Sequence, residues 1–453
     1  MLAHFICRRD GHMPHSQSRA LLNERKQTVC AARGSLFFVG IVRNVRGDWQ
    51  AGRCCLCVKR DAFLCYNKHK QYYGSLMEAS DHDRPSEEER RVKIRDIRIG
   101  IIAIPLKTPF KTALRRVDAA EDLIVQVRTD DGAVGYGNAP ATVVITGDSH
   151  ESVAAAVTHT IGPALIGRDI DDREDILQVI QHAMVHNTSA KAALDIAVHD
   201  LFAQKYGMPL HRFFGGAASR IVSDLTVSVN EPSVMAADAQ KAAAAGYRHI
   251  KVKVGLDSEE DFRRVQAVRT AVGPAIALRL DANQGWKPKE AVRLIRRMED
   301  AGLDIELVEQ PVAAWDIDGL KMVTDSVDTD IMADESAFDV HDVFRLLSLR
   351  ACDLINIKLM KAGGLGPAAK MAAMAESAGV GCMMGCMLES KVGITAAAAL
   401  SAGQPVFVKN DLDAADLMAE DPVQGGISYD KNELVLSDRP GLGIIHIAGW
   451  REL

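Results

Sequence analysis

The amino-acid sequence predicts an α/β protein, a modified (β/α)8-type (TIM) barrel that carries a smaller α+β capping domain. Three observations support this prediction. Eight short β-rich segments repeat through the C-terminal half of the chain, helical segments alternate with most of them, and an antiparallel strand pair with an Asp-Gly turn precedes them. Eight strands that alternate with helices are the signature of such a barrel.

The α+β part begins near Arg91. Residues 92–105 alternate apolar and charged side chains, as a half-buried strand does. A second strand pair, 123–128 and 133–137, flanks an Asp-Asp-Gly sequence that is typical of a hairpin turn. We expect an amphipathic helix over 189–206, because its apolar residues recur on one face and a glycine and a proline follow it.

The repeat begins near Ser223, and the segments between its strands have helical periodicity, for example 258–272 and 289–301. A doubly wound open sheet is the alternative architecture. It requires a glycine-rich phosphate turn after the first strand, and Asn230-Glu231-Pro232 is not one. The eight predicted strands are 225–229, 250–254, 277–280, 306–308, 330–333, 354–358, 381–385 and 406–409.

The composition is ordinary for a globular enzyme: 453 residues, 47% hydrophobic and 25% charged, with a formal net charge of −6. Domains of about 100–200 residues would allow two or three here. A mildly acidic chain gives no reason to expect nucleic acid as a partner. The apolar stretch 36–42 is far too short to span a bilayer. We therefore expect a cytoplasmic protein that is not a membrane protein.

The first 76 residues differ from the rest, with 13 Lys and Arg against 4 Asp and Glu, and six of the nine cysteines. Cys54-x-x-Cys57 has no second pair or histidine at zinc-ligand spacing, which argues against a zinc site. A transit peptide is one interpretation, and an extension upstream of a start near Met77 is the one we favour. We expect residues 1–90 outside the fold, a capping domain over 91–215 with a C-terminal return over 425–453, and the barrel over 216–424.

Ionisable residues stand at the ends of six of the eight predicted strands. A barrel has its active site at the C-terminal ends of its strands. A single charged residue there is commonly part of a solvated loop, but six that converge on one mouth indicate a functional site. They are Lys251 and Lys253 in strand two, Asp281 after three, Glu309 after four, Asp334 after five, Lys358 in six, and Asp411 with Asp413 after eight.

Three of these residues predict a metal site. Asp281, Glu309 and Asp334 are 28 and 25 residues apart, one repeat each, so they occupy three adjacent strand ends. Carboxylate oxygens without His or Cys suit Mg²⁺, which also leaves positions open for water or substrate oxygens. The sequence predicts one Mg²⁺ per active site and argues against zinc.

The lysines predict acid–base chemistry. Lys251 and Lys253 project to the same side of their strand, and adjacent ammonium groups are expected to lower the pKa of at least one of them. Lys358 lies four strands further round, opposite Lys253. Two lysines on opposite sides of one metal-bound substrate can remove a proton from a carbon and return it from the other face. The negative charge formed in between requires stabilisation by the metal and nearby cations.

With these residues the chain resembles the muconate-lactonising subgroup of the enolase superfamily. The likeness runs from about Arg91 to the C-terminus. It includes residues 193–216 and the sequences LRLDANQGW, LVEQP, IMADES and INIKLMKAGG around the site residues. The resemblance implies a Mg²⁺-dependent 1,1-proton transfer with Lys253 and Lys358 as the catalytic residues and Lys251 beside the substrate.

Within that subgroup the chain is most similar to the dipeptide epimerases, in particular the L-Ala-D/L-Glu type of peptidoglycan (murein) metabolism. The resemblance implies that Asp411 and Asp413 bind the free ammonium of the dipeptide. Arg115, in the capping-domain loop 109–115, would then grip the Glu side chain, as suits a guanidinium. The family also lines its substrate pocket at the positions of Thr226, Cys386 and Leu388.

Several alternatives stay open. Arg115 beside Arg116 is also consistent with a solvated basic pair, and Thr226 with a buried strand residue. Asn138 stands where the family commonly has Glu, which bears on how the capping domain meets the barrel mouth. The alternative activities are those of an N-acylamino-acid racemase, an o-succinylbenzoate synthase or a muconate-type cycloisomerase, and the alternative from another class is a non-catalytic binding protein. We expect a homo-oligomer.

Overall fold

The computed structural model describes residues 91–112, 115–216 and 218–453, together with five short strands in the first 90 residues. Chain contacts divide the protein into two compact units, Met1–Arg90 and Arg91–Leu453. The sequence does not predict the five strands, whose side chains, including those of Cys54 and Cys57, lie outside the described residues. The expectations about zinc, a start near Met77 and the domain limits stay predictions. The strands are β1 (Thr28–Ala32), β2 (Ser35–Val39), β3 (Cys54–Lys59), β4 (Ala62–Asn67) and β5 (Lys70–Tyr73).

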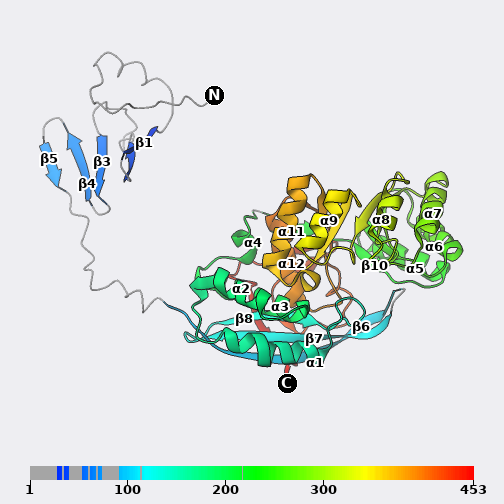
Figure 1. Cartoon of the computed structure of the whole chain (residues 1–453), viewed down its shortest axis with the longest axis horizontal. Helices are drawn as coiled ribbons and strands as arrows, with labels where there is room; N and C mark the ends of the chain where they lie inside the picture. The colour runs from blue at the N-terminus through cyan, green and yellow to red at the C-terminus, as the bar shows by residue number, and fades with distance from the viewer. Residues whose placement is uncertain are drawn as a thin grey trace, which may run out of the picture. The chain divides into compact units, whose positions relative to one another are not determined.

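Eight parallel strands form the nearly closed barrel that the sequence predicts (Figure 1). Their hydrogen bonding follows chain order from β10 to β17. The N–H of Asp224, beside β10, donates to the carbonyl of Asn410 in β17 at 3.3 Å. The strands are β10 (Leu225–Val227), β11 (His249–Lys253), β12 (Ala277–Asp281), β13 (Ile305–Glu309), β14 (Asp330–Ala333), β15 (Leu354–Lys358), β16 (Gly381–Gly385) and β17 (Phe407–Asp411).

Helices connect the barrel strands, and local sequence sets their ends. The carboxylate of Asp257 accepts from the N–H of Glu260 at 2.9 Å and so caps the predicted helix α6. Helix α7 begins at Pro288, one residue before the predicted start, because proline suits the first turn of a helix. The helices are α5 (Pro232–Ala244), α6 (Ser258–Val272), α7 (Pro288–Asp300), α8 (Ile317–Thr324), α9 (Val340–Leu349), α10 (Leu359–Ala362), α11 (Leu365–Ala378) and α12 (Lys391–Gly403).

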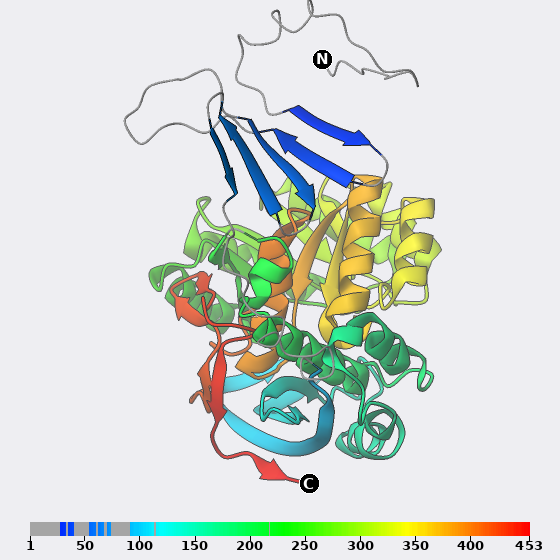
Figure 2. The same ribbon diagram turned by 90° about the vertical axis from the view of Figure 1, so that its left-hand side faces the viewer.

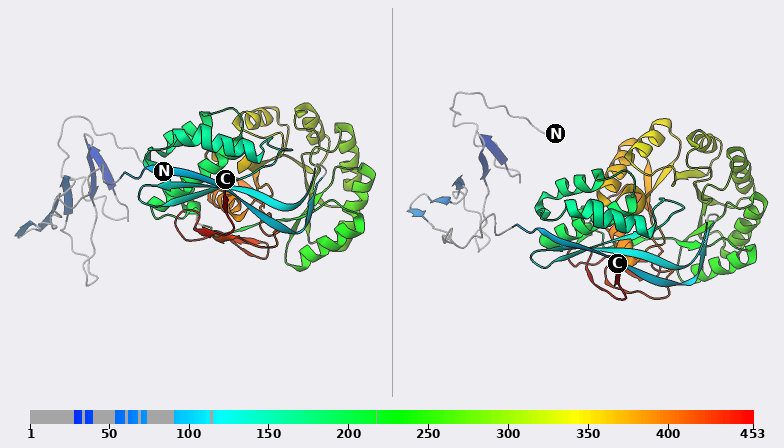
Figure 3. Two further views of the ribbon diagram at one scale, coloured as in Figure 1. Left: turned by 90° about the horizontal axis from the view of Figure 1, so that it is seen from below. Right: turned by 60° about the horizontal axis from the view of Figure 1, so that its bottom comes forward.

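A four-stranded antiparallel sheet, β22-β6-β7-β8, is the base of the capping part. It includes all three predicted strand segments, and β6 continues beyond residue 105 because it pairs with β7 again near the tip of their hairpin. The C-terminus returns to this sheet, where β22 pairs with β6 (Figures 2 and 3). The bounds are β6 (Ile94–Lys111), β7 (Arg116–Thr129), β8 (Val134–Pro140), β22 (Arg451–Glu452), α1 (His150–Ala155), α2 (Arg173–His182), α3 (Thr188–Lys205) and α4 (Leu210–Phe213).

Helix α3 matches the predicted helix in length, but the prediction of an amphipathic helix is wrong. Its polar residues Asp195, His199 and Asp200 are buried like its apolar ones. The helix lies between the capping sheet and the barrel helices α10 and α11, so it has no solvent face along most of its length (Figure 1). Such a position requires each buried polar group to have a partner.

Short elements complete the described fold. No helix among the described residues is long and apolar enough to cross a membrane. The remaining elements are a π-helical turn at Ala156–Ile161, 3-10 turns at Gly162–Ala164 and Ile170–Asp172, and the strands β9 (Arg220–Val222), β18 (Val423–Gly425), β19 (Ser428–Asp430), β20 (Glu433–Val435) and β21 (Ile444–Ile447).

Candidate active site

The three predicted metal ligands lie side by side at the barrel mouth. Asp281 ends β12, Glu309 ends β13 and pairs with Asp281 in register, and Asp334 follows β14. All three residues are at most 1% exposed. Leu307 of β13 belongs to a buried apolar cluster inside the barrel. The other members of that cluster come from β14, β15 and β16. The parallel strands thus hold three carboxylates at one level above an apolar interior.

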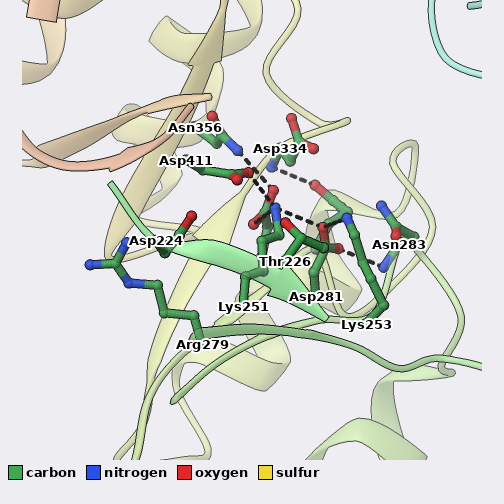
Figure 4. Close-up of polar contacts among 12 residues, drawn as sticks. Asp224, Thr226, Lys251, Lys253, Arg279, Asp281, Asn283, Asp334, Asn356 and Asp411 are labelled. Carbon is green, nitrogen blue, oxygen red and sulfur yellow. Dashed lines mark hydrogen bonds and ion pairs between the residues drawn. The ribbon is translucent and has the colours of Figure 1, made fainter. Parts of the chain in front are cut away.

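The Lys251 ammonium lies among these carboxylates (Figure 4). Its Nζ is 3.0 Å from Asp281 Oδ2, 2.7 Å from Glu309 Oε2 and 2.7 Å from Asp411 Oδ2. A cation therefore already stands between carboxylates contributed by three different strands. This arrangement balances the buried negative charge of the site.

For Lys251, the expected lowering of the pKa is not found. Burial lowers the pKa of Lys251, but the charges of Asp281, Asp411 and Glu309 outweigh it and hold the pKa well above its ordinary value. The pKa of Lys358 is raised too, since Asp334 and Glu309 outweigh burial there. A neighbouring ammonium counts for less than the carboxylates that surround it. A divalent cation bound by those carboxylates would offset the charge that raises both pKa values.

Two further lysines contact the ligand carboxylates from opposite sides of the mouth. Lys253 Nζ lies 2.5 Å from Asp281 Oδ2, and Lys358 Nζ lies 2.7 Å from Asp334 Oδ2. Both side chains are less than a tenth exposed and line the same cavity. Their strands, β11 and β15, are four strands apart in the barrel. A substrate in the cavity would therefore have an amine on each side.

The donor chemistry of the site fits Mg²⁺. Asp281, Glu309 and Asp334 offer only oxygen atoms, and burial together with the charge of Asp281 raises the pKa of Glu309 to about 8, which a bound cation would reverse. In the described part of the chain, no group of three or more Asp, Glu, His or Cys side chains is arranged as a metal site. Lysine ammonium groups lie between the carboxylates instead. These three carboxylates are the residues that would hold Mg²⁺.

A cavity opens above the carboxylates, between the barrel mouth and the capping hairpin. All nine predicted lysine and substrate residues line it: Arg115, Thr226, Lys251, Lys253, Lys358, Cys386, Leu388, Asp411 and Asp413. The sequence does not predict its other lining residues, which include Phe110, Val144, Ile145, Asn283, Met387 and Leu417. Phe110 and Asn283 lie within motifs that the resemblance already singles out, whereas nothing in the local pattern marks Val144 and Ile145, which follow β8.

The acidic pair, with Asp411 as the last residue of β17 and Asp413 two residues further on, lines this cavity. Asp413 Oδ2 accepts from the N–H of Thr226 at 2.6 Å, while Asp411 Oδ2 contacts Lys251. Burial and the charge of Asp411 raise the pKa of Asp413 to about 7. Two carboxylates so close together repel, and a ligand with a positive charge relieves that repulsion. The pair therefore suits an ammonium group.

Arg115 stands at the capping side of the cavity. Burial lowers its pKa, and no ion pair between Arg115 and a carboxylate occurs among the described residues. Its hairpin is bonded to the barrel, since Lys111 donates to Ser228 Oγ at 3.1 Å and Lys107 N–H donates to the carbonyl of Leu417 at 2.9 Å. The hairpin thus holds a guanidinium over the cavity, where it suits a carboxylate.

Comparison with known proteins shows the family to which the chain belongs. Residues 95–215 match the N-terminal domain of the mandelate racemase / muconate lactonizing enzyme family, and residues 234–446 match the enolase C-terminal domain-like family. The chain belongs to the enolase superfamily, as its sequence predicts.

The most similar relatives include two L-Ala-D/L-Glu epimerases. The chain is 50% identical to that of Clostridium acetobutylicum over 351 residues, or 78% of this chain and 98% of the relative. It is 51% identical to that of Bacillus subtilis over 358 residues, or 79% and 98%. A N-succinyl-L-Arg/Lys racemase of Bacillus cereus is 35% identical over 78% of this chain and 95% of its own.

Solved structures of dipeptide epimerases have the same fold as this chain. A substrate-liganded complex of the Bacillus subtilis L-Ala-D/L-Glu epimerase has a TM-score of 0.78 at 52% identity, covering 79% of this chain and 99% of the other. The dipeptide epimerase of Enterococcus faecalis V583, complexed with Mg and L-Leu-L-Tyr, has a TM-score of 0.76 at 42% identity, covering 78% and 100%. The likeness confirms the predicted barrel with its capping domain.

Proposed function

We propose that this protein is a Mg²⁺-dependent dipeptide epimerase that inverts the Cα of the C-terminal residue, with L-Ala-D/L-Glu as substrate. The observation that supports this most directly is the set of charged groups lining one cavity: an acidic pair, a guanidinium, and two lysine amines from strands that are four apart in the barrel. Two L-Ala-D/L-Glu epimerases, each matched at 50% identity or more over nearly its full length, support the same substrate.

Binding follows from this charge pattern. Asp411 and Asp413 would hold the ammonium of the dipeptide, and Arg115 would hold the Glu side-chain carboxylate. Thr226, Cys386 and Leu388 would form the walls between them. The reacting Cα then lies above the ligand carboxylates and between Lys253 and Lys358.

Inversion needs one neutral and one protonated lysine. The neutral amine, on Lys253 or Lys358 according to the enantiomer, takes the α-proton from one face, and the ammonium on the other side gives a proton to the opposite face. When bound, Mg²⁺ supplies positive charge beside the substrate carboxylate and so favours loss of the adjacent proton. Asp281, Glu309 and Asp334 are the residues that would hold it. At the end the two lysines have exchanged protonation states.

The test compares two substrates in D₂O. Purified enzyme with Mg²⁺ should epimerise L-Ala-L-Glu and exchange its Glu α-proton, followed by NMR. N-acetyl-L-Ala-L-Glu lacks the ammonium, and loss of a buried charged partner commonly costs about 2–5 kcal/mol, so its turnover should fall at least about 30-fold. Equal turnover of the two compounds would contradict the dipeptide assignment and favour an N-acylamino-acid racemase.

Several wider properties belong to the same proposal. We infer that the enzyme is a cytoplasmic homo-oligomer, that it takes small dipeptides and no nucleic acid, and that it serves peptidoglycan recycling. A non-catalytic binding protein is disfavoured, because such a protein has no need of both Lys253 and Lys358 beside three buried carboxylates.

A further inference from the structure

A small buried cluster joins the capping sheet to the barrel. Asn138, near the end of β8, donates from Nδ2 to Asp122 Oδ2 at 3.0 Å and to Glu389 Oε2 at 2.9 Å. Asp122 belongs to β7 of the capping sheet, and Glu389 belongs to the barrel loop between β16 and α12. One amide group thus bridges two carboxylates, one from each side of the interface.

The same carboxylates hold the barrel loop, residues 386–390. Glu389 Oε1 accepts from the N–H of Met387 at 2.9 Å. Asp122 Oδ2 accepts from the N–H of Ser390, the N-cap residue of α12, at 2.8 Å. Cys386, Met387 and Leu388 of this loop line the substrate cavity. Asn138 therefore contacts both carboxyl groups that accept hydrogen bonds from the backbone of this loop, namely those of Asp122 and Glu389.

The cluster is enclosed. Asn138 and Asp122 are 0% exposed and Glu389 is 3% exposed. Gly393 packs directly against it, because a Cβ there would lie 1.8 Å from Glu389 Oε2 and 2.6 Å from Asn138 Oδ1. No space is left for a larger side chain at that point. The Asn138 amide can be removed only at the cost of leaving two buried carboxyl groups without the donor that they share.

We propose that Asn138 is a positioning residue of the substrate pocket, through which the capping sheet sets the shape of the 386–390 loop. Asn138 does not line the cavity, and it acts through Glu389 and Asp122. The residue that departs from the pattern of the resembling family thus has a defined place in this chain: it supplies donors where a Glu would add a third carboxylate. The effect on substrate rests on the proposed function, whereas the effect on the loop does not.

Amide hydrogen exchange tests the effect on the loop. In Asn138→Ala and Asn138→Asp, exchange across residues 386–390 should be about tenfold faster than in the unaltered protein, since a buried hydrogen bond is lost. Gln181→Ala is the matched control, because Gln181 Nε2 also bonds the capping part to the barrel, at the Gly363 carbonyl 2.7 Å away, but outside the pocket. This control should leave exchange at 386–390 unchanged.

Steady-state kinetics test the effect on the substrate. Both Asn138 variants should raise KM for L-Ala-L-Glu about tenfold and change kcat less than about threefold, because the pocket wall contributes binding to ground and transition states alike. If Asn138→Asp does not fold, Asn138→Ala gives the same reading. Unchanged exchange, or faster exchange without a rise in KM, overturns the proposal. If the unaltered enzyme does not turn over L-Ala-L-Glu, the proposed function fails, and exchange at 386–390 alone decides the positioning role.

Discussion

At the scale of single residues, the buried lysines at the barrel mouth are each paired with buried carboxylates. Lys251, Lys253 and Lys358 each contact at least one carboxylate from a neighbouring strand end. Lys361 adds a fourth ammonium, fully buried and 2.5 Å from Asp334 Oδ1. A buried charge is tolerated only with such partners, so each site residue depends on the others for its protonation state.

The two lysines that we propose as catalytic residues should differ in the enantiomer that each one serves. Lys253→Ala and Lys358→Ala should each lower the rate of epimerisation by about 10²–10⁴-fold, because inversion needs a proton donor and an acceptor on opposite faces. Each variant should still exchange the α-proton of one enantiomer in D₂O, and the two variants should differ in which one. NMR of both diastereomers measures this, and near-normal inversion by either variant would show that the two-base chemistry is wrong.

Glu389 should make stability fall as pH rises. Burial and the charge of Asp122 raise its pKa to about 8, and burial raises the pKa of Asp122 to about 6. The folded protein then holds a proton on Glu389 between about pH 4.5 and 8 that the unfolded chain has released. The contribution of Glu389 to the free energy of unfolding is therefore greatest below about pH 4.5. It is lost as the pH rises from there to about 8, by up to about 1.4 kcal/mol per pH unit.

The check is urea unfolding from pH 5 to 8. The difference in free energy of unfolding between the unaltered protein and Glu389→Gln should change with pH, in favour of Gln at pH 8. Lys358 faces Glu389 and His150 faces Asp122, and both are present in the two proteins compared. Glu376→Gln, an exposed change in α11, serves as control. A pH-independent difference for Glu389→Gln would contradict the prediction.

At the scale of elements, the capping helix α3 caps a barrel helix. Asp195 Oδ1 accepts from the N–H of Leu365 at 2.7 Å, and Asp195 Oδ2 lies 3.3 Å from the N–H of Gly366, both in the first turn of α11. The carboxylate is fully buried. It supplies acceptors for two N–H groups that an isolated helix would leave unpaired. This explains why a polar residue is tolerated in the middle of a buried helix.

Asp195→Ala should therefore destabilise the fold by about 1–3 kcal/mol, because it leaves buried N–H groups without an acceptor. Asp195→Asn keeps an oxygen acceptor and should cost less. Asp257→Ala removes the N-cap of α6, whose hydrogen bond is exposed, and should cost about 1 kcal/mol. Denaturant unfolding of the three variants gives the order, and an Asp195→Ala loss no larger than that of Asp257→Ala would show that burial adds nothing here.

At the scale of the whole molecule, bound Mg²⁺ should both allow epimerisation and raise the free energy of unfolding. Treatment with EDTA should abolish epimerisation and Mg²⁺ should restore it. Mg²⁺ at about 100 times its Kd should add about 2.7 kcal/mol to the free energy of unfolding, since it binds the folded state. Isothermal titration of Mg²⁺ into Asp281→Asn should show weakened binding. Full activity in metal-free enzyme would exclude the assignment.

The unit Arg91–Leu453 should work without the segment before Met77. It contains the barrel, the capping sheet and every residue of the candidate site. A chain that starts at Met77 should fold and keep its kcat and KM for L-Ala-L-Glu within about twofold, because it retains the whole of that unit with its core and candidate site. Loss of folded, active protein would show that residues 1–76 are part of the fold.

Local sequence patterns are sufficient to predict the barrel and most of the candidate site. Strand segments and the ionisable residues at their ends are short-range patterns, so the positions of Asp281, Glu309, Asp334, Lys253 and Lys358 could be predicted.

How these groups interact with one another depends on the three-dimensional arrangement of the chain. The raised pKa of Lys251 sums charges from residues 30 and 160 positions away, and the partners of Asn138 come from β7 and from a loop beyond β16. Val144 and Ile145 reach the cavity because the capping part covers the barrel. Burial and charge interactions depend on distance in space, which spacing along the chain does not contain.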